Sequence, residues 1–326
     1  MDKDGQLIFN DDPFLIACNT AYQLIEEGKF PEAIEKIDKL MGENPDYPGL
    51  VETFRTAKFW KNRSNDIEAL EKGKSTADFL MMQWEVFRRY SLEKNIIDSA
   101  AYHAAMKYIF FEAAEQYKVA YLEEQSTINS FDLLLNLGVC FITLGEYRHA
   151  IEALEFARIT FRSNAKLLSL LGEAYYHLGE IPKSLYCFKE AFFVDPSEID
   201  LSLLKAKPIL QLAALAREKK PGKDEREWIP VFGHIEDLFY VKRQVNTQQV
   251  ESIKREIFTL EKSLYQIGRE KAEETNIIPR LINKYLWMLD YFELQHYDFN
   301  NIADIRSQLI KIDREIFEEF FKNKPK

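Results

Sequence analysis

The sequence predicts an all-α protein in which a row of helical hairpins is followed by a C-terminal bundle of long helices. Two observations predict this class. A glycine-containing pattern that begins at Leu137 returns at Leu171, and a fixed period of about 34 residues is typical of stacked helical units. Residues 231–326 instead carry apolar side chains at alternating steps of three and four, the spacing of helices that pack along a seam. Glycine and proline are scarce, at 12 and 11 of 326 residues.

The repeat places matching side chains in register over two consecutive units, residues 131–198. The matched pairs are Leu134 and Leu168, Leu137 and Leu171, Gly138 and Gly172, Phe141 and Tyr175, Gly145 and Gly179, Tyr147 and Ile181, Ala150 and Ser184, Leu154 and Phe188, and Ala157 and Ala191. Gly145 and Gly179 are expected to end the first helix of each unit, where a left-handed residue costs glycine little. Small residues inside the helices are expected to let the two helices of a unit approach closely.

This register resembles the tetratricopeptide repeat (TPR) family, and the resemblance covers residues 131–198 without an insertion. A third unit with the same order of residues is expected at 14–47, with its turn at Gly28. The resemblance implies a right-handed superhelix of helix pairs, in which the first helix of each pair lines a concave groove.

The segments around these units are less regular. Residues 1–13 form an N-terminal extension, and 48–130 are expected to hold irregular or degenerate repeats. The stretch 65–90 has the spacing of one unusually long helix. The stretch 94–127 has Tyr108 where a turn glycine is expected, so its two helices can run on as one.

Residues 199–220 are expected to form a helix that caps the array and that is broken or kinked near Pro208. Residues 221–230 contain Pro, Gly and mixed charges and are the best candidate for a linker.

The C-terminal segment, 231–326, is expected to fold as a coiled-coil-like bundle of three long helices. Its two apolar series are Val250, Ile253, Ile257, Leu260, Leu264 and Ile267, and then Ile302, Ile305, Leu309, Ile312 and Ile316. A helix with Pro279 in its first turn lies between them. The heptad seams could be satisfied within the chain, or they could mediate a homodimer.

Composition and charge exclude several classes of function. The net charge of −10 argues against nucleic-acid binding, which usually needs a basic face. No signal peptide and no apolar run of about 20 residues is found, so no membrane insertion is expected. Cys18, Cys140 and Cys187 are odd in number and far apart, which argues against disulfides or a zinc site. We expect a cytoplasmic protein.

No catalytic or metal-binding motif occurs. The five histidines show no H-E-x-x-H spacing, and no phosphate-binding or nucleophile motif is present. His149 and His177 are expected to be solvated or locally bonded. We therefore expect no catalytic residue, no metal and no cofactor, and no enzymatic activity.

The resemblance to TPR proteins implies which residues would line the groove. These candidate partner-binding residues are Tyr22, Ile25, Leu135, Val139, Ile142, Lys166, Glu173, Tyr176 and His177. Some TPR proteins hold a peptide carboxylate with a lysine and asparagine clamp. The matching positions here are Leu135 with Val139, and Ser169 with Glu173, so the clamp is absent and binding of chaperone tails is not expected.

These patterns predict a non-enzymatic scaffold or adaptor that binds a protein or peptide partner through the groove. One alternative is a peptide-responsive sensor whose C-terminal helices dimerise or transmit a signal. Another is a component of a larger bacterial envelope or motility assembly.

Overall fold

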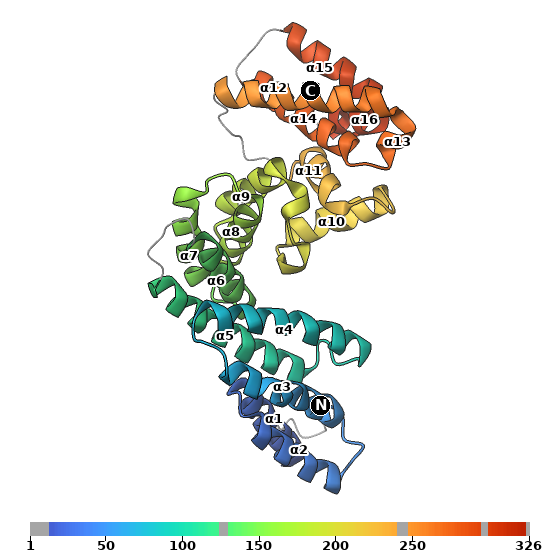
Figure 1. Cartoon of the computed structure of the whole chain (residues 1–326). Helices are drawn as coiled ribbons and strands as arrows, with labels where there is room; N and C mark the ends of the chain where they lie inside the picture. The colour runs from blue at the N-terminus through green and yellow to red at the C-terminus, as the bar shows by residue number, and fades with distance from the viewer. Residues whose placement is uncertain (1–12, 124–129, 240–246, 295–298, 324–326) are drawn as a thin grey trace, which may run out of the picture. The chain divides into compact units, whose positions relative to one another are not determined.

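The computed structural model describes residues 13–123, 130–239, 247–294 and 299–323 (Figure 1). All the regular structure in these residues is helical, with sixteen α-helices, two short 3-10 helices and no strand. Helices that follow one another in the chain pack against each other as hairpins, which confirms the all-α prediction. The chain divides into two compact units, residues 1–146 and 147–326.

The first unit contains six helices. They are α1 (Pro13–Glu26), α2 (Phe30–Glu43), α3 (Leu50–Glu68), α4 (Lys74–Glu93), α5 (Ala100–Glu123) and α6 (Ser130–Leu144). Helix α5 packs against its neighbours α4 and α6 and also against α1 and α3. Aromatic rings fill the space between α3, α4 and α5, where Trp84 contacts Phe87, Tyr102 and Phe110.

The irregular middle segment differs from the sequence prediction in one respect. Residues 65–90 do not form a single long helix, because α3 ends at Glu68 and α4 begins at Lys74. Gly73 precedes α4 with a φ of +96°, a conformation that L side chains rarely adopt, and its N–H donates to Oε1 of Gln116 at 2.8 Å. The expected continuity at Tyr108 is confirmed, since Tyr108 lies inside the 24-residue helix α5.

The second unit contains the remaining helices. They are α7 (Tyr147–Thr160), α8 (Ala165–His177), α9 (Ile181–Val194), η1 (Pro196–Glu198), η2 (Leu201–Leu203), α10 (Lys207–Lys219), α11 (Glu225–Ile235), α12 (Thr247–Ile267), α13 (Arg269–Glu273), α14 (Ile277–Leu294), α15 (Phe299–Ile312) and α16 (Arg314–Asn323). Helix α8 packs between α7 and α9, and α11 packs against α9, α10, α14 and α16. Helix α14 is central to the C-terminal helices, because it contacts α11, α12, α13 and α15.

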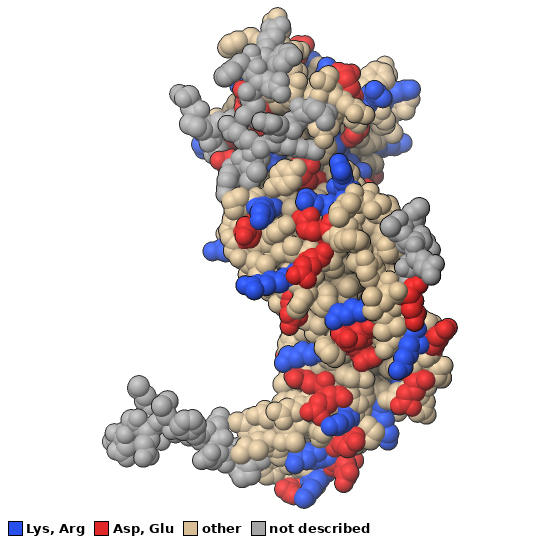
Figure 2. Space-filling model, turned by 90° about the vertical axis from the view of Figure 1, so that its left-hand side faces the viewer, with Lys and Arg blue, Asp and Glu red and all other residues tan. Residues whose placement is uncertain are grey.

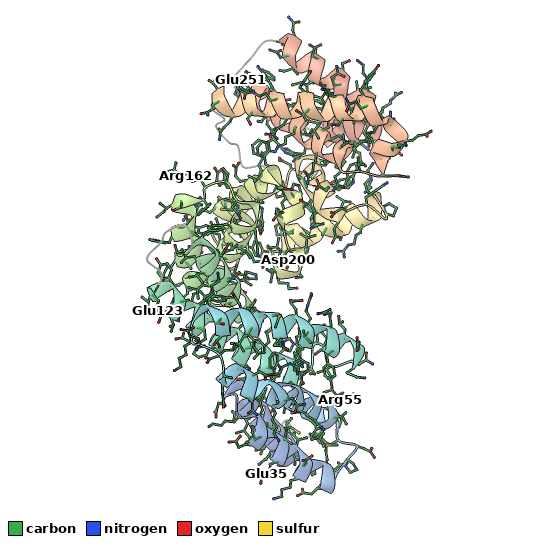
Figure 3. All side chains as sticks on the ribbon, viewed as in Figure 1. Glu35, Arg55, Glu123, Arg162, Asp200 and Glu251 are labelled. Carbon is green, nitrogen blue, oxygen red and sulfur yellow. The ribbon has the colours of Figure 1, made fainter. Side chains whose placement is uncertain are left out.

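The segment predicted as a capping helix (199–220) and a linker (221–230) differs from that prediction, because only the short helix η2 lies between residues 199 and 206 and α11 begins inside the predicted linker. Of the predicted break or kink near Pro208, the structure shows the break: α10 begins at Lys207 with Pro208 in its first turn, where its missing N–H costs nothing. Asp200, labelled in Figure 3, caps the short helix η2 before it by accepting the N–H of Ser202 at 2.9 Å. The predicted linker, residues 221–230, is helical from Glu225 onward, and its Trp228 is buried in α11.

The C-terminal helices also differ from the predicted three. The apolar series that ends at Ile316 spans two helices, because the helical structure is interrupted at Asp313, between α15 and α16. Oδ1 of Asp313 accepts the N–H of Ile316 at 3.0 Å, which is the bond of an N-cap. The periodicity continues through the break, so sequence spacing alone could not reveal it.

Three glycine turns in the two units have the same backbone geometry. Gly28, Gly145 and Gly179 have φ values of +73°, +78° and +79°. In each turn the residue after the glycine donates its N–H to the carbonyl five residues earlier, at 2.8, 2.8 and 3.0 Å. This is the Schellman pattern of a helix C-terminus, and it confirms that these glycines end helices.

The pair α8 and α9 shows the close approach expected of small residues. A β-carbon on Gly172 would lie 2.7 Å from Cδ1 of Phe188. Oγ of Ser184 donates to the carbonyl of Gly172 at 2.7 Å. These contacts hold the two helices in one register.

Candidate functional site

Most of the groove residues predicted in the first unit are buried. On α1, Ile25 is 0% exposed, and on α6 the exposed fractions of Leu135, Val139 and Ile142 are 6%, 7% and 8%. Tyr22 is partly exposed, and burial raises the pKa of its hydroxyl. These four aliphatic side chains therefore offer little surface to a partner.

The four groove residues predicted in the second unit all lie on α8, but their surroundings differ. Glu173 is 1% exposed, and its carboxylate accepts the backbone N–H groups of Lys205 and Ala206 at 2.7 and 3.0 Å. The chain's own segment before α10 thus covers this position. Nε2 of His177 lies 2.8 Å from Oε1 of Glu173. The Glu173 carboxylate is therefore already occupied by groups of the same chain.

Tyr176 and His177 come together at the C-terminal end of α8. The His177 ring stacks on Tyr147, with centroids 4.3 Å apart, and meets the Tyr176 ring edge-on. Tyr176 is partly exposed, as is Lys166 near the start of the helix. Of the predicted groove on α8, these are the side chains with surface available for contact.

The three cysteines are buried, as expected of small apolar side chains. Burial raises the pKa of the Cys140 and Cys187 thiols to about 12, so both are protonated and weakly nucleophilic near neutral pH. In the part of the chain that the structure describes, no three His, Cys, Asp or Glu side chains cluster as metal ligands do. None of the described helices has the length and apolar character needed to cross a bilayer.

Charges of both signs are mixed on the face of the molecule drawn in Figure 2. Figure 2 shows one face, on which Lys and Arg alternate with Asp and Glu instead of separating into regions of one sign. Several charged side chains of the chain pair within one helix, as Arg88 does with Glu85 and Arg158 with Glu155. Exposed pairs of this kind contribute little to stability.

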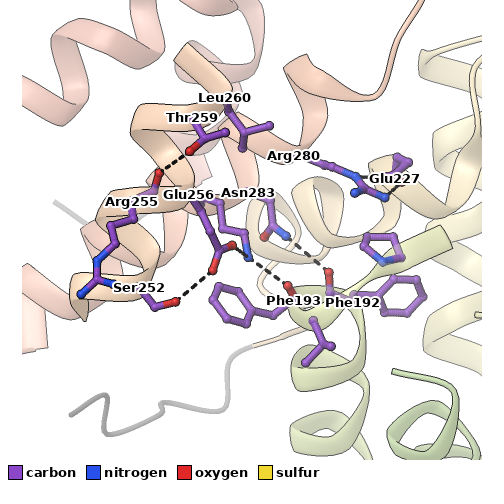
Figure 4. A pocket seen from close by; sticks show the side chains of 13 residues that line it. Phe192, Phe193, Glu227, Ser252, Arg255, Glu256, Thr259, Leu260, Arg280 and Asn283 are labelled. Carbon is purple, nitrogen blue, oxygen red and sulfur yellow. Dashed lines mark hydrogen bonds and ion pairs between the residues drawn. The ribbon is translucent and has the colours of Figure 1, made fainter. Parts of the chain in front are cut away.

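A pocket that sequence reasoning missed lies in the second unit, between the end of α9 and helices α12 and α14 (Figure 4). Its volume is about 340 Å³, which is at the small end for ligand sites. Apolar walls come from Phe192, Phe193, Val194, Pro196 and Leu260. Polar groups come from Glu227, Ser252, Arg255, Glu256, Thr259, Arg280, Asn283 and Lys284.

An ion network built around the buried Glu227 forms one end of this pocket. Nε of Arg280 donates to Oε2 of Glu227 at 2.9 Å, and its Nη2 donates to Oδ1 of Asp195 at 2.9 Å. The Glu227 side chain is 0% exposed. Burial raises the pKa of Glu227, although the bond from Arg280 opposes that change. The network joins α11 and α14 to the residue that caps η1.

The other polar residues of α14 satisfy carbonyls at the end of α9. Nδ2 of Asn283 donates to the carbonyl of Phe192 at 3.5 Å, and Nζ of Lys284 donates to that of Phe193 at 3.0 Å. Nζ of Lys284 also lies 2.8 Å from Oε2 of Glu256. Burial lowers the pKa of Lys284. Since the last carbonyls of a helix have no partner inside it, these bonds tie α9 to α14.

Comparison with known proteins adds no relative. No family model matches the chain, and neither a curated protein nor a solved structure matches it.

The signal for the polar residues of α14 was present in the sequence. Arg280, Asn283 and Lys284 stand at i, i+3 and i+4 in an otherwise apolar stretch, which places them on one face of a helix. A polar stripe on a buried helix usually has partners. The identity of those partners on α9, α11 and α12 could not be read from the spacing.

Proposed function

We propose that the protein is a TPR-type helical-repeat scaffold that binds a protein partner and has no enzymatic activity of its own. The observation that carries the proposal is the recurrence of one turn geometry at Gly28, Gly145 and Gly179. The last two lie one repeat period apart. In this proposal the helix pairs coil as a right-handed superhelix, as in the family that the sequence resembles.

The packing of α8 and α9 supports the same proposal. Gly172 and Ser184 occupy the positions where small residues let the helices of such a unit meet, and Phe188 fills the contact. Stacked hairpins of this kind present extended surfaces to partners.

Within this proposal, the partner contacts the C-terminal end of α8 through Tyr176, His177 and the surface beside them. Aromatic side chains that are partly exposed next to polar ones are common anchors of interfaces. The buried positions Ile25, Val139 and Ile142 are left out of the binding surface, because reaching them would require the helices to separate.

Affinity purification of the full chain from its native cell, followed by mass spectrometry, tests the proposal. The comparison is between the parent chain, Tyr176→Asp and the control Lys183→Asp. Lys183 is exposed on α9, where its Nζ pairs with Glu180 and lies 5.4 Å from the centre of the Tyr175 ring. We expect the same partner with the parent and the control, and at least tenfold less with Tyr176→Asp. Equal recovery with all three proteins contradicts the proposal.

A further inference from the structure

Helix α12 carries a largely exposed stripe of side chains, which another described helix, α14, contacts only at its edge. Of its 21 residues, only Val250 and Ile253 are buried. Those two pack with Met288 and Phe292 of α14. The N-terminal end of the α12 heptad seam therefore packs against α14 within the same chain. Another face of α12 is left exposed to solvent.

The stripe consists of Phe258, Lys262 and Tyr265, which are exposed, and Glu261, which is partly exposed. These residues stand at i, i+3, i+4 and i+7, so they lie on one face over two helical turns. Phe258 is 68% exposed and Tyr265 is 90% exposed. Two such rings on one helix face form a contiguous apolar area, and contiguous exposed apolar areas mark interaction surfaces more often than single exposed side chains do.

The stripe is complementary to itself when reversed. In an antiparallel pair of α12 helices centred between Glu261 and Lys262, Phe258 of one copy faces Tyr265 of the other. The same arrangement sets Glu261 of each copy against Lys262 of its partner. A two-fold axis makes every contact twice, which is the form of the commonest homodimer interface.

We infer that the protein forms an antiparallel homodimer through this stripe of α12. Lys262 has no partner among the described residues, so it is free to pair with a carboxylate of a second copy. Glu261 already accepts a hydrogen bond from the hydroxyl of Tyr285, which holds its carboxylate at the edge of the stripe. This inference does not depend on the proposed function.

The size of the contact sets its strength. Two helical turns from each copy bury less than the roughly 1,600 Å² of a standard interface. The dimer is therefore expected to be weak and to dissociate on dilution. Burial of the aromatic rings supplies most of the driving force, and the charged pairs fix the register.

Sedimentation equilibrium of the full chain over a range of concentrations tests the dimer. The expected mass rises from that of the 38.4 kDa monomer toward twice that value. Phe258→Asp and Tyr265→Asp are expected to raise the dissociation constant at least tenfold. Phe299→Asp is the matched control, since Phe299 on α15 is 87% exposed and lies outside the stripe. A parent chain that stays monomeric at every concentration overturns the inference.

Cysteine cross-linking tests the antiparallel register. The native cysteines are buried, so they interfere little. Oxidising a mixture of Phe258→Cys and Tyr265→Cys chains is expected to give a mixed disulfide dimer, because positions 258 and 265 face each other. Each variant alone is expected to cross-link at least fivefold less. Cross-linking of Tyr265→Cys with itself at the level of the mixture overturns the antiparallel arrangement.

Discussion

Gly172 lies so close to Phe188 that a β-carbon on residue 172 would come within 2.7 Å of the ring. The ring cannot move away from such a β-carbon into solvent, because Phe188 is 0% exposed and surrounded by other side chains. This contact fixes the distance between α8 and α9, and the hydrogen bond from Ser184 to the Gly172 carbonyl fixes their register.

Gly172→Ala is therefore expected to destabilise the protein. Overpacking a tight core contact costs about 1–3 kcal/mol, and the helix propensity of alanine returns less than about 1 kcal/mol of that. Urea unfolding followed by circular dichroism measures the change. Gly42→Ala is the control, because nothing lies within 4 Å of a β-carbon there. We expect that control to be neutral or slightly stabilising, and equal loss in both variants would contradict the account.

At the Gly179 turn we expect substitutions to change stability for a different reason. No atom lies within 4 Å of a β-carbon at this position, but its φ is +79°. The cost of Gly179→Ala is thus conformational, about 1–2 kcal/mol. Asparagine tolerates the left-handed region better than alanine, so Gly179→Asn should lose less stability. A ranking in which alanine is as stable as glycine would show that the turn opens in solution.

Glu173 predicts a local effect on the start of α10. Its carboxylate accepts the N–H groups of Lys205 and Ala206 on different oxygens. Glutamine has only one accepting oxygen, so Glu173→Gln leaves a backbone N–H without its partner, at a cost of about 1–3 kcal/mol. Hydrogen exchange at residues 205 and 206 should quicken. Glu180→Gln, at a side chain that is 51% exposed, should leave those amides unchanged.

Asp224 predicts a pH dependence. The hydrogen bond from the Arg226 guanidinium lowers the pKa of this aspartate below its ordinary 3.8. As pH falls, the unfolded chain takes up the proton first, so the stability from this pair is present above the ordinary pKa and is lost as pH falls through the lowered one. We expect Asp224→Asn to be less stable than the parent at pH about 6 and to approach it below pH about 3. Urea midpoints at both pH values check this, and a constant difference between the two proteins would refute it.

The sequence was informative where one local pattern determines one local structure. A glycine that ends a helix, and the apolar spacing through Val250 and Ile253, each determine the structure of only a few neighbouring residues. The structure confirms both predictions. The breaks at Gly73 and Asp313 were missed, because apolar periodicity runs on across a turn when the helices on both sides pack on the same core.

The candidate site was harder to predict than the fold. The groove positions were assigned by resemblance alone, and spacing cannot tell which helix face the rest of the chain covers. Glu173 is buried because residues more than 30 positions later return to it. Arg280 likewise meets Glu227 and Asp195 from distant segments. Such contacts depend on tertiary packing, which a single sequence does not display.

We propose that the exposed end of α8 binds a protein partner. Site-specific photo-cross-linking tests it most directly, with p-benzoylphenylalanine placed at position 176 in the native cell and, as a control, at position 183 on α9. The account predicts a discrete adduct with one partner at position 176 and none at position 183. Adducts of equal yield at both positions, or none at either, would contradict it.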